Sequence, residues 1–244
     1  MKKILLLGVY GMEVVECGGA LLKNVLEGGQ SYAGMMIAGE QSKPQIKLAA
    51  EKLKTDLKFL DYEMGNILPT KEQKIPMVHY IREINPDIII TQDPEHCISD
   101  LDPDRRMAMT VILESIALSS RNFEVLEGEK LSKIPTIYYM TPSHPNCLLD
   151  ISDVWEEKQD ALNMLESQLM FSAMFYENNY GSQLMETIIP EWNQLDSLLE
   201  KGKVSMQVFN QAYYLSNGSL EHSNLAFAET YRKEGLFEFN SLMV

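Results

Sequence analysis

The chain has 244 residues, of which 45% are hydrophobic and 23% are charged, so the composition is that of a folded globular protein rather than a disordered one. Its net charge of −14, from 21 Lys and Arg against 35 Asp and Glu, opposes binding to phosphate backbones and anionic lipids. We therefore expect neither nucleic acid nor a membrane surface as a partner. No apolar run approaches the roughly 18 residues that a membrane-spanning helix needs.

The first residues and the cysteines bear on location. The apolar run at residues 4–8 is too short for a signal peptide, and Glu13 falls where a cleavage site would have small residues, so we interpret the start as a first strand. The three cysteines are odd in number and far apart, which indicates reduced thiols and a cytoplasmic location rather than a disulfide framework: Cys17, Cys97 and Cys147.

The first part of the chain alternates between strand and helix patterns. Residues 3–9 form an apolar run typical of a buried parallel strand, and a glycine-bearing turn leads into helical spacing over residues 20–26. Gly28 and Gly29 end that helix before a second strand over residues 31–38. This order of strand, turn, helix and strand predicts one βαβ unit.

The alternation then continues through the chain. We expect helices near residues 43–54, 70–84 and 104–119, strands at residues 57–60, 87–91 and 135–140, and mainly helix beyond Asp150, at residues 152–170, 187–201 and 204–215. The predicted fold class is α/β, a Rossmann-like doubly wound and mostly parallel sheet with a helical C-terminal elaboration. We expect one domain over residues 1–244, with a βα core at 1–150 and a mainly helical part at 151–244. The strand at 3–9 is predicted to be central and parallel to the strand at 87–91.

Candidate functional residues gather in the loops that follow the strands, where open parallel sheets bind ligands. The glycine spacing G-x-G-x-x-G is absent, which argues against a dinucleotide site. The loop at 93–104 can be read as a metal site that uses His96 or, more simply, as a polar loop in which Asp102 or Asp104 caps the next helix. His144 follows another strand and is either a solvated loop residue or a residue that faces the cleft.

Several motifs together resemble the LmbE-like/PIG-L family of zinc-dependent N-acetylglucosaminyl deacetylases. The family motif A-H-P-D-D-E-x-x-x-C-G-G aligns with residues 8–19, Gly39-Glu40 resembles its G-E, and residues 85–91 resemble its R-P-D strand. Its H-P-D-H-R aligns with residues 102–106. The most specific match is the segment Asp150-Ile151-Ser152-Asp153-Val154-Trp155-Glu156-Glu157-Lys158, and Ala228-Glu229-Thr230-Tyr231 resembles the late A-E-x-F.

The resemblance implies zinc as a cofactor, yet the residues that would bind it are missing. The positions of the three family ligands are occupied by Val9, Met12 and Arg105, and the general base position by Gly11. Valine has no donor atom, arginine stays protonated, and a thioether is a soft ligand unsuited to zinc that must activate water. A later family histidine aligns with Leu165. We therefore expect no zinc and no other cofactor.

Three functions remain open. The first, which the ligand chemistry favours, is a deacetylase-fold protein without zinc-dependent activity that binds a small sugar- or carboxylate-containing molecule in the cleft. The second is a metal-dependent amide hydrolase with a rearranged metal site, and the third is a metal-independent enzyme that uses Cys17 or His144. The resemblance also implies a homo-oligomer. The candidate cleft residues are Val9, Tyr10, Gly11, Met12, Glu13, Glu40, His96, Asp102, Asp104, Arg105, Arg106 and His144.

The sequence also predicts where the side chain of Arg105 points. Loss of the metal would leave the carboxylates of Glu13 and Asp104 in a partly buried cleft, and an unpaired buried charge is costly. We expect the guanidinium of Arg105 to point into the cleft and to contact Glu13 or Asp104 in place of the metal.

Overall fold

Two near-continuous apolar runs form neighbouring strands inside the sheet of the computed structural model, which describes residues 1–235. β1 (Lys3–Gly8) and β4 (Ile88–Gln92) are parallel, with Leu5 paired with Ile89. Both side chains are buried because helices cover both faces of the sheet. The predicted central and parallel arrangement of these two strands is confirmed.

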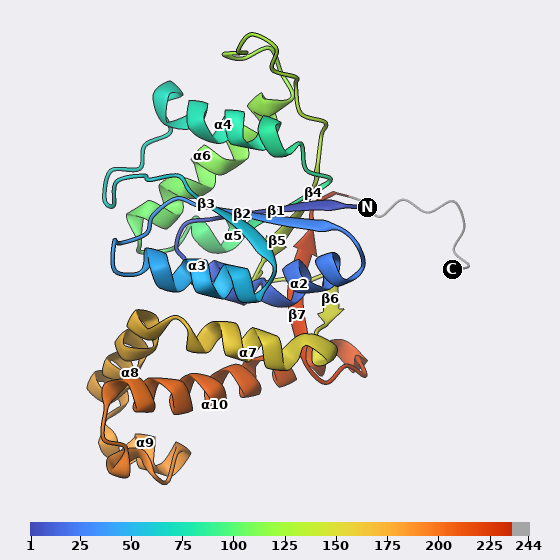
Figure 1. Ribbon diagram of the computed structural model, residues 1–244. Coiled ribbons are helices and arrows are strands. Elements are labelled where there is room, and N and C mark those ends of the chain that lie inside the picture. Colours follow the sequence, from blue (N-terminus) through green and yellow to red (C-terminus); the bar gives the residue numbers. More distant parts are fainter. Residues whose placement is uncertain (236–244) are drawn as a thin grey trace.

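Within residues 1–235, seven strands form one sheet in the order β3-β2-β1-β4-β5-β7-β6 (Figure 1). The first five strands in this order are parallel, whereas β7 is antiparallel to both of its neighbours. The chain moves outward from β1 in one direction and from β4 in the other, so the switch point lies between these two strands. The remaining strands are β2 (Gln30–Met35), β3 (Thr55–Phe59), β5 (Thr136–Met140), β6 (Cys147–Asp150) and β7 (Ala228–Lys233).

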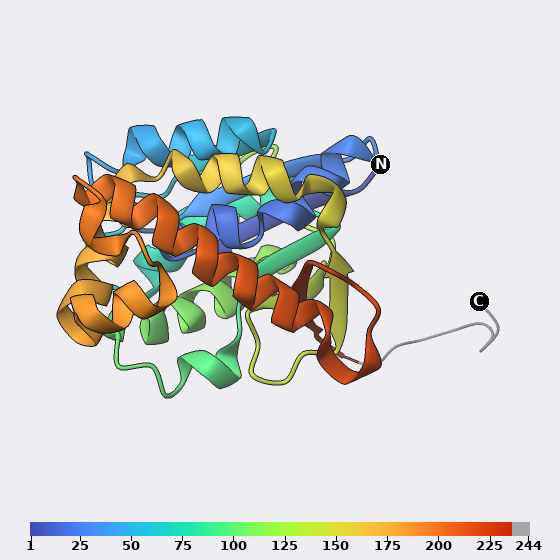
Figure 2. The ribbon, with the colours of Figure 1, turned by 90° about the horizontal axis from the view of Figure 1, so that it is seen from below.

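Helices cover the sheet in layers, as Figures 1 and 2 show. One face is covered by α4 (Lys71–Ile84) and α6 (Pro103–Ser119), and the other by α1 (Glu13–Glu16), α2 (Gly18–Leu26) and α3 (Lys43–Lys52). A further layer lies beneath the second face and consists of α7 (Trp155–Asn163), α8 (Glu166–Tyr180) and α10 (Leu198–Gly218), with α9 (Ser182–Ile188) beside α8. The short α5 (Pro94–Cys97) follows β4.

The structure corrects several predicted elements of the C-terminal part. The predicted helix at 152–170 is interrupted at Leu165, which has non-helical backbone angles, so that α7 and α8 are separate. The predicted helix at 187–201 is wrong, because Pro190 forces Ile189 into an extended conformation that ends α9. The helix predicted at 204–215 is the later part of α10. The strands β6 and β7 were not predicted.

The predicted fold class is confirmed: the sheet is mostly parallel, and its C-terminal elaboration is mainly helical. The helices within residues 1–235 lack the combination of length and apolarity that a bilayer crossing requires. Residues 236–244 of the predicted C-terminal part lie outside the described residues.

A buried ion pair joins the C-terminal part to the first helices. Lys158 on α7 lies 2.6 Å from Glu229 on β7, and its Nζ also donates to the carbonyl oxygen of Glu16 at 2.7 Å. The carboxylate of Glu229 accepts the backbone N–H groups of Gly19 at 2.7 Å and Ala20 at 2.9 Å. The pair therefore satisfies polar groups at the end of α1 and at the start of α2, which would otherwise be buried without partners.

Replacement of Glu229 by Ala should destabilise the fold by about 3–5 kcal/mol, because the buried ammonium of Lys158 would lose its counter-charge. Urea unfolding followed by circular dichroism measures this change. Glu83, in an exposed pair with Lys58 at 3.2 Å, is the matched control, and Glu83→Ala should cost about 1 kcal/mol or less. Equal losses in the two variants would contradict the assigned importance of the buried pair.

Candidate functional site

The loops at the carboxyl ends of β1, β2, β4 and β5 enclose two cavities on either side of the segment from residue 9 to residue 13. We call them the acidic cavity and the neutral cavity, after their side chains. The acidic cavity has a volume of about 490 Å³ and is lined by Glu13, Glu16, Gln92, Asp93, His96, Cys97, Asp100, Arg105, Met140, Thr141 and Tyr213. The neutral cavity has a volume of about 250 Å³.

Glu13 and Arg105 form the centre of the acidic cavity. Arg105 lies in the first turns of α6, and its Nη1 donates to Oε1 of Glu13 on α1 at 3.1 Å. The backbone N–H of Tyr10 donates to the other oxygen of Glu13 at 3.0 Å, and the Tyr10 ring lies 5.1 Å from the guanidinium carbon. The expected contact with Glu13 is thus present, whereas Asp104 instead accepts the backbone N–H of Gly65 at 2.7 Å.

Burial changes the protonation behaviour of the two glutamates in α1. Glu13 is 1% exposed, and its burial raises its pKa from 4.5 to about 7, although the positive charge of Arg105 acts in the opposite direction. Burial likewise raises the pKa of Glu16, against the charges of Arg105 and Lys158. Among residues 1–235 the carboxylate of Glu16 has no hydrogen bond or ion pair, so this acidic group faces the cavity unpaired.

The other walls of the acidic cavity also present acceptor atoms. The side-chain N–H of Gln92 donates to the carbonyl of Arg105 at 2.7 Å, but its Oε1 has no partner among the described residues. Asp93 is paired with Arg232 at 2.6 Å. Asp100 lies 4.0 Å from the Nε of Arg105. Burial raises the pKa of the Cys97 thiol to about 12, so the thiol is not an activated nucleophile.

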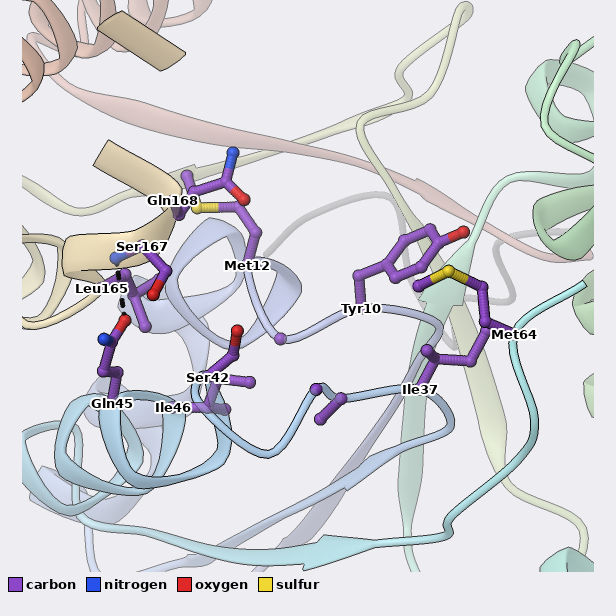
Figure 3. Close-up of a pocket in the computed structure, with 13 residues that line it drawn as sticks. Tyr10, Met12, Ile37, Ser42, Gln45, Ile46, Met64, Leu165, Ser167 and Gln168 are labelled. Atoms are coloured by element: carbon purple, nitrogen blue, oxygen red, sulfur yellow. Dashed lines mark hydrogen bonds between the residues drawn. The ribbon is translucent and has the colours of Figure 1, made fainter. Parts of the chain in front are cut away.

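The neutral cavity lies between the segment after β1 and the start of α8 (Figure 3). None of the side chains that line it in the described part of the chain is charged. Gln45 and Ser167 meet in its wall, where the side-chain oxygen Oε1 of Gln45 accepts the backbone N–H of Ser167 at 2.9 Å. The lining residues are Tyr10, Gly11, Met12, Ile37, Ala38, Gly39, Ser42, Gln45, Ile46, Met64, Leu165, Ser167 and Gln168.

The remaining candidates from the sequence have structural partners or lie outside both cavities. Asp102 caps α6 and also accepts the hydroxyl of Tyr10 at 2.7 Å, which agrees with the simpler interpretation of this loop.

Glu40 is exposed and paired with Lys43, and Arg106 donates to the carbonyl of Asp100. His144 is 83% exposed in its side chain and lies 3.3 Å from Glu95, and it lines a third cavity, at the end of α10, rather than either of these two. Val9 is buried in the core beside α4 and α6. His96 does line the acidic cavity.

The residues at the family's metal and base positions do not fit zinc in this structure. Val9 is packed in the core and Met12 lines the neutral cavity, while the third position holds the cationic Arg105. A Cβ atom on Gly11 would overlap the side chain of Ile46, so the place of the family's base is filled. Within residues 1–235, no three His, Cys, Asp or Glu side chains are grouped as ligands of a metal ion.

Reasoning from the sequence missed several cavity residues. Glu16, Gln92 and Asp93 are close in sequence to predicted site residues, and their place at the ends of α1 and β4 was a signal that could have found them. Tyr213 lies in the later half of α10 and reaches the acidic cavity only through tertiary packing. No local pattern marks it.

Comparison with solved structures gives several proteins that share this fold. GalB, the 4-carboxy-2-hydroxymuconate hydratase from Pseudomonas putida, is 17% identical with a TM-score of 0.67, over 99% of this chain and 100% of its own. The N,N'-diacetylchitobiose deacetylase from Pyrococcus horikoshii is 18% identical with a TM-score of 0.70, over 95% and 83%. The conserved protein TT1542 from Thermus thermophilus is 16% identical with a TM-score of 0.67, over 98% and 97%.

Neither a family model nor a curated protein matches the sequence. At this level of identity a structural likeness shows the fold alone, and these neighbours carry at least two different activities, a hydratase and a deacetylase. The expected resemblance is confirmed at the level of the fold. The chain has the fold of the LmbE/PIG-L-like deacetylases.

Proposed function

We propose that the chain is a metal-free protein of this fold that binds a small molecule rich in amino and hydroxyl groups, such as an amino sugar, in the acidic cavity. The unpaired carboxylate of Glu16 carries this proposal, because an unpaired acidic group in a recess favours a ligand that donates hydrogen bonds or bears a positive charge. The unpartnered acceptor of Gln92 adds a second group that requires a donor.

A carboxylate-containing ligand is the weaker alternative. It would use Arg105, but Nη1 of that residue is already paired with Glu13 and its Nε faces Asp100. A carboxylate would also enter next to Glu16 and Asp93, which are acidic. The charge balance of the acidic cavity therefore favours an amine or a polyol.

A rearranged metal site has still less support. Of the residues that it would need, Asp102 caps a helix and His144 is exposed beside Glu95. Glu13 is paired with a guanidinium. These three side chains thus have other partners. His96 and Asp100 do line the acidic cavity, but no group of three His, Cys, Asp or Glu side chains suited to a metal ion occurs within residues 1–235.

The protein, purified without an affinity tag, should contain no stoichiometric zinc and should not deacetylate N-acetylglucosamine conjugates when zinc is added. The reason is that Val9 and Met12 offer no ligand able to hold zinc for water activation. Elemental analysis and an acetate-release assay measure the two properties. Arg105→His should not restore zinc binding, since it supplies a single ligand. Zinc-dependent turnover that a chelator abolishes would refute this prediction.

Glucosamine should bind more tightly than citrate, and Glu16→Gln should weaken the binding of glucosamine by about tenfold, because the ligand's ammonium loses a carboxylate partner. Isothermal titration calorimetry measures both affinities. Glu40→Gln is the matched control, since Glu40 is exposed outside both cavities, and it should leave binding unchanged. Preference for citrate, or binding of neither compound, would contradict the proposed ligand class.

Glu13 should make the stability of the protein depend on pH. The pKa of Glu13 is about 7 in the folded protein and 4.5 ordinarily, so the folded state binds the proton more tightly than the unfolded state. This difference stabilises the fold fully below about pH 4.5, and the stabilisation is lost as the pH rises through 7. The stability of the wild type relative to Glu13→Gln should therefore fall by about 3 kcal/mol between pH 4.5 and 7.5. Urea unfolding at a series of pH values tests this, with Glu40→Gln as the control that should show no such fall. Parallel curves for the wild type and Glu13→Gln would contradict the shifted pKa.

A further inference from the structure

One face of α8 presents large apolar side chains to solvent. Met170, Phe171, Met174 and Phe175 recur at the spacing that places them on one side of a helix, and all four are exposed, Phe171 at 61%. The opposite side of α8 packs on α10 through buried residues such as Leu169. We call the four exposed residues the α8 face. Contiguous exposed apolar side chains of this size mark an interaction surface in a soluble chain.

The helix α8 lies at one end of the helical layer beneath the sheet, as Figure 1 shows. Its N-terminal end adjoins the neutral cavity, because Ser167 and Gln168 of the same helix line that cavity. The surface is thus separate from the acidic cavity proposed above as the ligand site.

The charge of the surrounding segment indicates which partner fits. Residues 159–200 contain no Lys, Arg or His, and their acidic residues are Asp160, Glu166, Glu177, Glu186, Glu191, Asp196 and Glu200. Two of these acidic residues are paired within the chain, Glu177 with Lys201 at 2.9 Å and Asp160 with Lys52 at 2.6 Å, and the other five have no such pair among the described residues. Two copies of this chain meeting through the α8 face would bring two such acidic segments together. A partner with basic residues around an apolar stripe would instead be complementary.

We propose that the α8 face binds a basic amphipathic helix of another protein. An amphipathic helix lays its apolar side on an apolar surface, and its basic residues would then lie opposite the acidic residues of the segment. Two of the four anchor residues are methionines, whose unbranched side chains adapt to differently shaped partners. The aromatic rings of Phe171 and Phe175 supply the larger contact area.

The test uses a fluorescent helix-forming peptide of Leu and Lys with one apolar side, and the full-length protein. Fluorescence anisotropy should show binding of this peptide and not of the same peptide with Glu in place of Lys. The double variant Phe171→Ser, Met174→Ser should weaken binding by about tenfold or more. Circular dichroism checks that this variant is folded, which is expected because both side chains are exposed.

The matched control changes exposed apolar residues elsewhere: Leu126→Ser, Ile134→Ser, at positions that are 60% and 86% exposed. This variant should bind the peptide as the wild type does. Equal binding by the Phe171 and Met174 variant would show that the peptide responds to overall charge alone, and would overturn the proposal. So would the absence of binding, or sedimentation that shows a dimer of the wild type which the Phe171 and Met174 variant loses.

Discussion

The ion pair between Lys158 and Glu229 fixes the geometry on which the acidic cavity depends. One partner lies in the layer of C-terminal helices and the other in β7, and both are buried. Together they bind the backbone where α1 ends and α2 begins. Because α1 carries Glu13 and Glu16, the position of the acidic cavity's wall depends on residues more than half the chain away. A buried pair of this kind holds position more than it adds net stability, since its desolvation is costly.

The residues at the positions that the sequence resemblance aligns with the family's metal site form a consistent set. A divalent ion bound by several side chains would be replaced here by the single positive charge of Arg105, which is held by Glu13. The space next to Gly11 is filled by Ile46, and Leu165, which the resemblance aligns with a family histidine, lines the neutral cavity. Loss of ligands alone would leave vacant polar space, which is unfavourable in a packed interior. The structure instead has a neutral cavity on one side of the segment and a charged cavity on the other.

The sequence was sufficient for the parallel core of the fold and insufficient for its antiparallel edge. The core strands are long apolar runs buried on both faces, and such runs are a strong local signal. By contrast, β6 is short, and β7 contains Glu229, a charged residue that is buried only because Lys158 meets it. The end of α9 before Pro190 was a readable signal, as was the capping box of Ser197 and Glu200 at the start of α10.

The candidate site, like the fold, was predictable from the sequence only in part. The motif positions identified Glu13 and Arg105 correctly as neighbours, but they could not decide between Glu13 and Asp104 as the partner. Consecutive residues in a helix point in directions about 100° apart, so Asp104 and Arg105 necessarily face different surroundings. The outer walls come from distant elements, such as Tyr213 on α10, whose position follows from packing. The neighbours at the centre of the candidate site can therefore be predicted from local motifs, whereas the residues of its outer walls are known only from the assembled fold.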